Sequence, residues 1–516
     1  MVRMTRGGRL RSMTALATGA VLVAALAACT PDGGSAPPPA AGDDGLPPLA
    51  DPLPLEQLAL FSGVATMDAG SNCTGTLIDT GVADGPAYIL TNGHCAGDIG
   101  RPAQRTTLGI EWGGTAEFFR AADHLDRTLR VDVVELAYST MRHTDTAVLR
   151  LDSTLGALEA QGVRPIRLAD TEPAEGTAVT NIAVPVQGLD FDDWVMRRGE
   201  CTLGAQHTLI EFLWLWFGVW SNDCPGVRQG SSGSPLLTLA ADGGPDEVVA
   251  VINTTTWGAR AGGECALNRP CEVSDGQARM TPETSYAQSV AGIGRCFDAS
   301  GEFALGEHCP LPTSDVWAED GGGSFRGGDL PDAADRVPEV SVVGAEEGTV
   351  RTAVVPIGDA TACAAETTYA GVSPVPLPEA GEVWDRVGVV VPVALPETEG
   401  HFLFCAVRGE AYGQAASVLF EVDRTPSVVP VGIDTIDFGD GTVMVQPHFD
   451  PPELSRVRFI WGPPDTVDCE NTDAFRDLMM VAPILTADDL PVLFCVYALD
   501  AAGNPTDVER FDIPAP

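Results

Sequence analysis

The sequence YILTNGHC at Tyr88–Cys95 is followed by DTAVLRL at Asp145–Leu151 and by GSSGSPLL at Gly230–Leu237. Each stretch joins a short apolar run to a turn rich in small or polar residues. Many such runs, separated by Gly, Asp, Asn and Pro, predict short β-strands and an all-β barrel or sandwich. The turns carry, in order, a histidine, an aspartate and a serine flanked by glycine.

These three residue types are the ones that nucleophilic catalysis by serine requires. A serine hydroxyl is a weak nucleophile at neutral pH and needs an adjacent base. Histidine suits this task because its pKa lies near neutrality, and a carboxylate on its other ring nitrogen fixes the tautomer. We therefore predict a triad of His94, Asp145 and Ser232, with the backbone N–H groups of Gly230 and Ser232 directed at a developing oxyanion.

In this order the three stretches resemble the His, Asp and Ser motifs of the chymotrypsin-like (trypsin-fold) serine peptidases, over about Leu58 to Leu311. The resemblance implies a double six-stranded β-barrel and a serine endopeptidase that works through an acyl-enzyme. Ser231 stands where trypsin has the aspartate that pairs with a newly cut N-terminus, and no Ile-Val-Gly-Gly start occurs near Phe61–Val64. The Ser-Gly-Ser-Pro form is similar to bacterial branches of the family, so we do not expect activation by N-terminal insertion.

The resemblance also implies where the substrate side chain is bound. The positions that match are Gly226, Val227, Thr256, Trp257 and Gly258. None of them is charged, and no histidine precedes Trp257, where glutamyl endopeptidases often carry one. Because an unpaired charge is costly to bury, we expect small or apolar P1 residues to be preferred over charged ones.

The first 29 residues predict a bacterial lipoprotein signal peptide. Four arginines precede an apolar run, Ala15–Ala25, that is too short to span a bilayer. The run ends in Leu26-Ala27-Ala28-Cys29, which resembles a lipobox and implies lipidation of Cys29. A Pro/Gly-rich linker is expected over 30–54. We thus predict an exported protein anchored in the bacterial cell envelope, at the outer membrane or cell surface.

Cysteine usage agrees with export. Of 13 cysteines, 12 remain once Cys29 is assigned to lipid, and an even number in an exported protein indicates disulfides. Spacing alone cannot fix their connectivity, so the following pairs are a hypothesis: Cys73–Cys95, Cys201–Cys224, Cys265–Cys271, Cys296–Cys309, Cys363–Cys405 and Cys469–Cys495. The tight CxxC pairs of a zinc site do not occur, and we expect neither a metal nor a cofactor.

Composition divides the rest of the chain. A protease domain is expected over 55–312, a Gly/Asp-rich linker over 313–337, and immunoglobulin- or fibronectin-like β-sandwiches over 338–424 and 425–516. The two halves share the similar strings FLFCAV at Phe402–Val407 and VLFCVYALD at Val492–Asp500. Since neither carries a catalytic cluster, we expect both to be dispensable for chemistry. The apolar run Ile210–Trp220 is expected to be a buried strand rather than a membrane or partner patch.

The net charge limits which partners the protein can bind, and two alternative functions have to be compared with that of a peptidase. A formal net charge of −42 and the absence of a basic run argue against nucleic acid as a partner. The partners that we expect are a protein or peptide substrate and the membrane, which the protein would contact through its lipid anchor. A non-catalytic surface adhesin on a protease fold is the main alternative. An α/β-hydrolase esterase fits less well, because its Gly-x-Ser-x-Gly turn would need glycine at Ser234 and its triad runs in another order.

Overall fold

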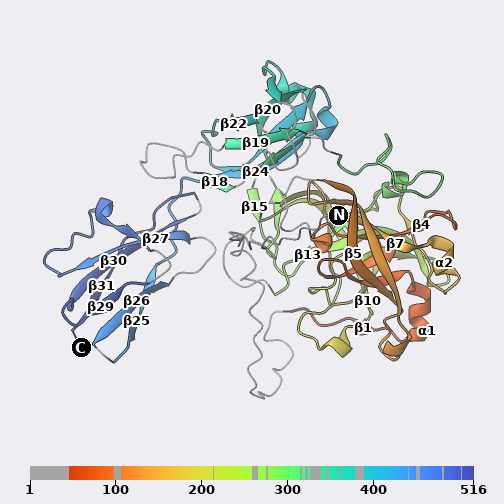
Figure 1. The fold of residues 1–516 in the computed structure, drawn as a ribbon, viewed down its shortest axis with the longest axis horizontal. Helices are drawn as coiled ribbons and strands as arrows, with labels where there is room; N and C mark the ends of the chain where they lie inside the picture. The colour runs from red at the N-terminus through yellow and green to blue at the C-terminus, as the bar shows by residue number, and fades with distance from the viewer. Residues whose placement is uncertain are drawn as a thin grey trace, which may run out of the picture. The chain divides into compact units, whose positions relative to one another are not determined.

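The regular secondary structure of the computed structural model is mainly β-strand, with only short helices (Figure 1). It describes residues 46–97, 106–212, 214–258, 265, 267–274, 277–313, 316–319, 323–325, 339–344, 348–358, 362–377, 389–439, 441–448, 454–478, 482–500 and 502–515. The predicted signal peptide, Cys29 and most of the 30–54 linker lie outside these residues. Within them, no helix is both long and apolar enough to cross a membrane.

The first barrel is a closed ring of six antiparallel strands in the order β2-β3-β4-β7-β6-β5. Its strands are β2 (Val64–Asp68), β3 (Asn72–Leu77), β4 (Pro86–Thr91), β5 (Thr107–Phe118), β6 (Leu129–Thr140) and β7 (Thr146–Thr154). Alternate side chains of these strands point inward, as the two-residue period of a strand requires. They fill one apolar core with residues such as Leu77, Ile89 and Leu149.

The second barrel is a ring of six strands, because the pairings β10-β11-β16-β13-β12-β9 return to β10. Its strands are β9 (Ala178–Ala183), β10 (Arg197–Glu211), β11 (Trp214–Asn222), β12 (Pro235–Leu239), β13 (Pro245–Thr255) and β16 (Ser285–Ser289). Four shorter strands extend its sheet: β1 (Asp51–Pro52), β8 (Arg167–Leu168), β14 (Cys271–Ser274) and β15 (Gln277–Arg279). The expected all-β, double-barrel fold is therefore confirmed.

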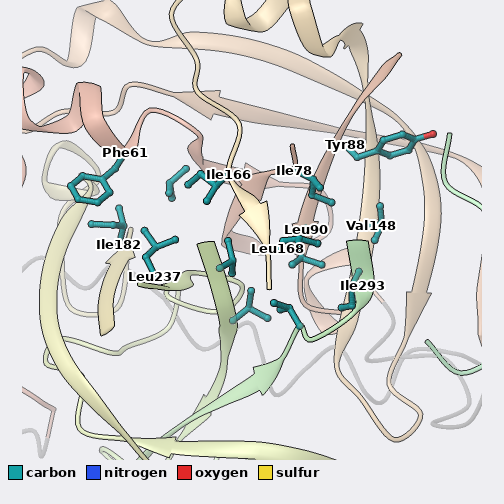
Figure 2. Packing of buried hydrophobic residues seen from close by; sticks show 14 of the residues in the cluster. Phe61, Ile78, Tyr88, Leu90, Val148, Ile166, Leu168, Ile182, Leu237 and Ile293 are labelled. Carbon is teal, nitrogen blue, oxygen red and sulfur yellow. The ribbon is translucent and has the colours of Figure 1, made fainter. Parts of the chain in front are cut away.

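A shared apolar cluster joins the two barrels. Figure 2 shows Leu90 and Val148 of the first barrel in the same cluster as Ile182 and Leu237 of the second. The short helix α1 (Leu55–Leu58) contributes Leu58 to this cluster, whereas the short helix α2 (Leu155–Glu159) packs Leu155 and Leu158 into the core of the first barrel. The junction between the barrels is thus a packed core, which fixes the loops at its edge relative to one another.

The apolar run Ile210–Trp220 forms a hairpin rather than the single strand that its composition suggested. It contains the end of β10 and most of β11, with Phe212 exposed at the turn in a left-handed conformation (φ +56°). No Gly or Asn stands between Ile210 and Trp214, where one would ordinarily mark such a turn. Its two strands stay buried because different neighbours cover their two faces.

Two β-sandwiches follow the barrels. The first consists of β17 (Val316–Glu319), β19 (Glu339–Gly344) and β22 (Val389–Pro392) opposite β18 (Gly323–Phe325), β24 (Ala416–Val422), β23 (Gly400–Arg408), β20 (Gly348–Pro356) and β21 (Val375–Leu377). The second consists of β25 (Gly432–Asp437), β26 (Thr442–His448) and β29 (Ile484–Thr486) opposite β28 (Arg476–Asp477), β27 (Leu454–Gly462), β30 (Val492–Asp500) and β31 (Glu509–Ile513). Each sandwich has its own apolar core.

Two segments that composition assigned to linkers take part in the fold. Residues 316–319 and 323–325 are strands β17 and β18, which pair with β19 and β24 of the first sandwich. Upstream, β1 pairs with β10, and Leu53 is buried in the inter-barrel core. Both linker predictions were wrong at these residues, because backbone pairing at a sheet edge needs no apolar side-chain pattern.

All six expected cysteine pairs form disulfides. They are Cys73–Cys95, Cys201–Cys224, Cys265–Cys271, Cys296–Cys309, Cys363–Cys405 and Cys469–Cys495. Four lie in the barrel region and one in each sandwich. Sulfurs committed to a disulfide offer no thiolate to a metal, so Cys73 and Cys95 beside His94 do not make a metal site.

Candidate active site

His94 and Asp145 form the centre of the candidate site. His94 begins a 3₁₀ turn, His94–Ala96, three residues after the last residue of β4, and Asp145 directly precedes β7, which pairs with β4. The Nδ1 atom of His94 lies 2.6 Å from Oδ2 of Asp145, and the backbone N–H of His94 donates to Oδ1 at 3.0 Å. The two carboxylate oxygens therefore fix both the ring and the backbone of the histidine.

Asp145 is fully buried, whereas the His94 side chain is one-fifth exposed. The side-chain amide of Asn92 donates to the Asp145 carbonyl oxygen at 2.9 Å, which ties the two loops together. A buried carboxylate on Nδ1 leaves Nε2 of the ring as the nitrogen free to accept a proton. This is the arrangement that a general base requires.

The Ser232 turn is held against the first barrel by Thr74. The backbone N–H of Thr74 donates to the Ser232 carbonyl at 2.8 Å, and its hydroxyl donates to the Gly230 carbonyl at 2.8 Å. Thr74 follows Cys73, whose disulfide partner Cys95 follows His94. One hydrogen-bonded strand and one covalent bridge thus connect the serine turn to the histidine turn.

Gly233 permits this close approach. Its φ is +79°, and a Cβ there would lie 2.1 Å from Oγ1 of Thr91 and 2.2 Å from the carbonyl oxygen of Thr74. Any larger residue would push the serine turn away from β3 and β4. The Gly-rich sequence around Ser232 is therefore explained by contact between the two barrels.

The charges around His94 favour its protonated form. Burial lowers the pKa of His94, but the charge and hydrogen bond of Asp145, with a smaller contribution from Glu211, raise it overall. Glu211 is almost fully buried at the end of β10, and burial raises its pKa to about 6. Its Oε1 accepts a hydrogen bond from the Asn268 N–H at 2.8 Å. The second acid stabilises the imidazolium that would form during catalysis.

The predicted substrate-binding residues fall in two places. Thr256, Trp257 and Gly258 follow β13, where the Thr256 hydroxyl donates to the Thr281 carbonyl at 2.8 Å. Gly226 and Val227 lie upstream of Ser232, with Val227 packed in the core of the second barrel. The Val227 side chain is therefore not exposed to a substrate.

Three residues that sequence reasoning missed contribute to the site: Thr74, Glu211 and Arg142. Thr74 and Glu211 lie in ordinary strand sequences with no motif around them. Arg142 lies three residues before Asp145, and its side chain is buried. A buried arginine is unusual enough to deserve a structural explanation, but burial is not visible in the sequence.

Comparisons with known proteins agree with this geometry at the level of the domain. Residues 73–250, which include His94, Asp145 and Ser232, match the family model described as a trypsin-like peptidase domain. No curated protein matches the chain. Just over a third of the chain is thus similar to a trypsin-like peptidase domain.

Solved structures that match about half of the chain include two proteases and one inactivated protease paralogue, all of low identity. The protease Anisep from Arthrobacter nicotinovorans is 13% identical, with a TM-score of 0.32, over 48% of this chain and 96% of its own. The scabies mite inactivated protease paralogue S-I1 is 15% identical, with a TM-score of 0.31, over 46% of this chain and 93% of its own. The thermostable serine protease AL20 from an extremophilic microorganism is 12% identical, with a TM-score of 0.30, over 46% of this chain and 94% of its own.

Proposed function

We propose that the protein is a serine endopeptidase with His94, Asp145 and Ser232 as its catalytic triad. The observation that supports it most is the bond between Nδ1 of His94 and the buried Asp145 carboxylate, beside a serine turn fastened to the same barrel by Thr74. A merely structural histidine would not need a fully buried carboxylate on one nitrogen and solvent access on its ring.

The proposed reaction proceeds through an acyl-enzyme. Nε2 of His94 takes the hydroxyl proton as Ser232 Oγ attacks the peptide carbonyl carbon, and Asp145 stabilises the resulting imidazolium. The N–H groups of Gly230 and Ser232 would bind the oxyanion, each donor contributing about 3 kcal/mol. The carbon–nitrogen bond breaks as His94 returns the proton to the leaving amine, and water then hydrolyses the ester by the same steps.

Labelling with a fluorophosphonate probe tests this proposal directly. Wild-type protein should be labelled, whereas Ser232→Ala should not be, and both Ser232→Ala and His94→Ala should lose at least about 10³-fold in peptide hydrolysis. Ser153→Ala, in β7 and away from the triad, is the matched control and should retain full activity. Unlabelled wild-type protein would favour the non-catalytic adhesin instead.

We further propose that the enzyme is exported, anchored by lipid on Cys29, and selective for small or apolar P1 residues. The lipobox-like sequence and the uncharged Gly226, Thr256 and Trp257 support these points. Radiolabelled fatty acid should be incorporated into the wild-type chain and not into Cys29→Ser. A peptide library in which basic or acidic P1 residues are cleaved best would refute the specificity.

A further inference from the structure

The loop before the catalytic aspartate contacts the first β-sandwich. We define the acid loop as Met141–Thr144, which connects β6 to Asp145. Within it, the Arg142 guanidinium donates to the carbonyl oxygen of Gln414 at 2.8 Å and also to that of Ala415. Nε2 of His143 lies 2.6 Å from the hydroxyl oxygen of Ser417. Arg142 and Ser417 are each only 1% exposed, so these contacts are shielded from water.

The hairpin of β10 and β11 packs against the same loop. The N–H of Phe217 donates to the His143 carbonyl at 2.9 Å, and the two rings lie 4.9 Å apart. On one face of the hairpin, Trp214 and Trp216 pack with Met141 of the acid loop.

The other face of the hairpin shares a core with the sandwich. Ile210 and Leu215 are buried in one apolar cluster with sandwich residues that include Leu403, Cys405 and Leu419. Alternate residues of β11 thus reach the acid loop and the sandwich, as strand periodicity requires. The sandwich therefore acts on the loop both directly and through the hairpin.

The acid loop needs this support because of its own conformation. His143 has a φ of +60°, in the left-handed region that residues other than glycine rarely occupy. Such a residue persists where neighbouring contacts fix it, and here the contacts come from Phe217 and Ser417. Burial, together with the charge of Arg142, lowers the pKa of His143 to about 3, so its bond to Ser417 is a neutral one near pH 7.

We propose that the first sandwich is a positioning element of the active site, which holds Asp145 against His94 through Arg142 and His143. This inference rests on the proposed function and replaces the expectation that both sandwiches are dispensable for chemistry. Its physical basis is that a catalytic group displaced by about 1 Å costs on the order of 10²-fold in rate. Arg142 and His143 are positioning residues, since they act through Asp145.

The test uses the full-length chain and three interface variants. Arg142→Ala should lower kcat for a short peptide by about 10- to 100-fold and change KM by less than about twofold, because substrate binding is not altered. Arg142→Lys, which keeps one charged donor, should recover part of that loss. Ser417→Ala, which removes the partner of His143, should lower kcat by roughly threefold.

Arg424→Ala provides a matched control. Arg424 also donates to two backbone carbonyls, those of Pro396 and Glu397, but these lie inside the sandwich and away from the acid loop. It should keep wild-type kcat. Thermal unfolding of every variant separates loss of fold from loss of positioning. If Arg142→Ala does not fold, the kcat values of Ser417→Ala and Arg142→Lys test the proposal.

Folded interface variants that keep wild-type kcat, or that lose no more than Arg424→Ala, would overturn the proposal. A loss of kcat confined to the interface variants, with Lys rescue, would support it. Failure of the proposed function is visible separately, because wild-type protein would then lack Ser232-dependent labelling.

Discussion

The nucleophile loop, Cys224–Ser231, is held by a segment that precedes the barrels in the sequence, whereas the acid loop is held by a domain that follows them. The acid loop is held by the first sandwich, through Arg142. The nucleophile loop is held by residues 46–53, where the Arg228 guanidinium donates through Nε to the carbonyl oxygen of Pro47 at 3.2 Å. The backbone N–H of Arg228 in turn donates to the hydroxyl of Ser231, which precedes the proposed nucleophile Ser232, at 3.2 Å.

The two braces differ in how tightly they join the barrel. Residues 46–53 belong to the barrel itself, since β1 pairs with β10 and Leu53 lies in the inter-barrel core. They leave so little space that a Cβ on Gly226 would lie 2.6 Å from the Ala50 nitrogen. The sandwich, in contrast, has a core of its own and meets the barrel through the acid loop and through an apolar cluster that it shares with the β10–β11 hairpin. The comparison shows that an arginine which binds backbone carbonyls can hold a loop of the candidate site against either kind of neighbour.

Removal of the N-terminal brace should have the largest effect. A chain that begins at Leu55 lacks the Pro47 carbonyl, the β1 pairing and the Leu53 side chain, so we expect at least about 100-fold lower kcat/KM. A chain that begins at Leu46 with an acetylated amino group should remain fully active, because no charged N-terminus is needed. Activity that appears only after trimming near Phe61 would contradict this comparison.

Loss of the Arg228 side chain alone should have a smaller effect. Arg228→Met keeps much of the volume but removes the bonds to the Pro47 and Gln187 carbonyls, so we expect kcat to fall by about 10-fold. Arg167→Met, which breaks only an exposed ion pair with Asp246, should match wild type. Equal kinetics for the two variants would show that the nucleophile loop does not need its brace.

Glu211→Gln should shift the pH profile without a large change in the plateau rate. The ionised carboxylate raises the pKa of His94, and protonated His94 cannot act as the base. Removing the charge should therefore move the acid limb of kcat/KM to lower pH. Glu135→Gln, in a partly exposed ion pair with Arg150, should leave the limb in place. A shift to higher pH in Glu211→Gln would contradict the assigned electrostatics.

Deletion of the second sandwich should have the smallest effect. Its apolar clusters, among the described residues, contain only residues from 429–513. A chain that ends at Arg424 should therefore keep kcat and KM for a short peptide within about twofold of wild type. A loss comparable to that of Arg142→Ala would mean that the second sandwich also braces the site.

Much of the fold was predictable because it follows local patterns. Alternating apolar residues and turn signals predicted the strands, and the even number of cysteines predicted disulfides that the structure contains. Several structural features were not predicted because their contacts are made by backbone atoms. Strands β17 and β18, and the carbonyls of Pro47, Gln414 and Ala415, use main-chain groups that every residue carries. No side-chain signature marks them.

The sequence by itself determined which side chains are available for chemistry: His94, Asp145 and Ser232 are recognisable from short motifs, because each needs a particular residue type beside a particular turn. Only the tertiary structure decided how their loops are held. Thr74, Arg142 and Arg228 act across 156, 272 and 181 residues of sequence, respectively. Contacts at such separations depend on how the barrels and the first sandwich pack, and packing is a property of the folded chain rather than of any local stretch.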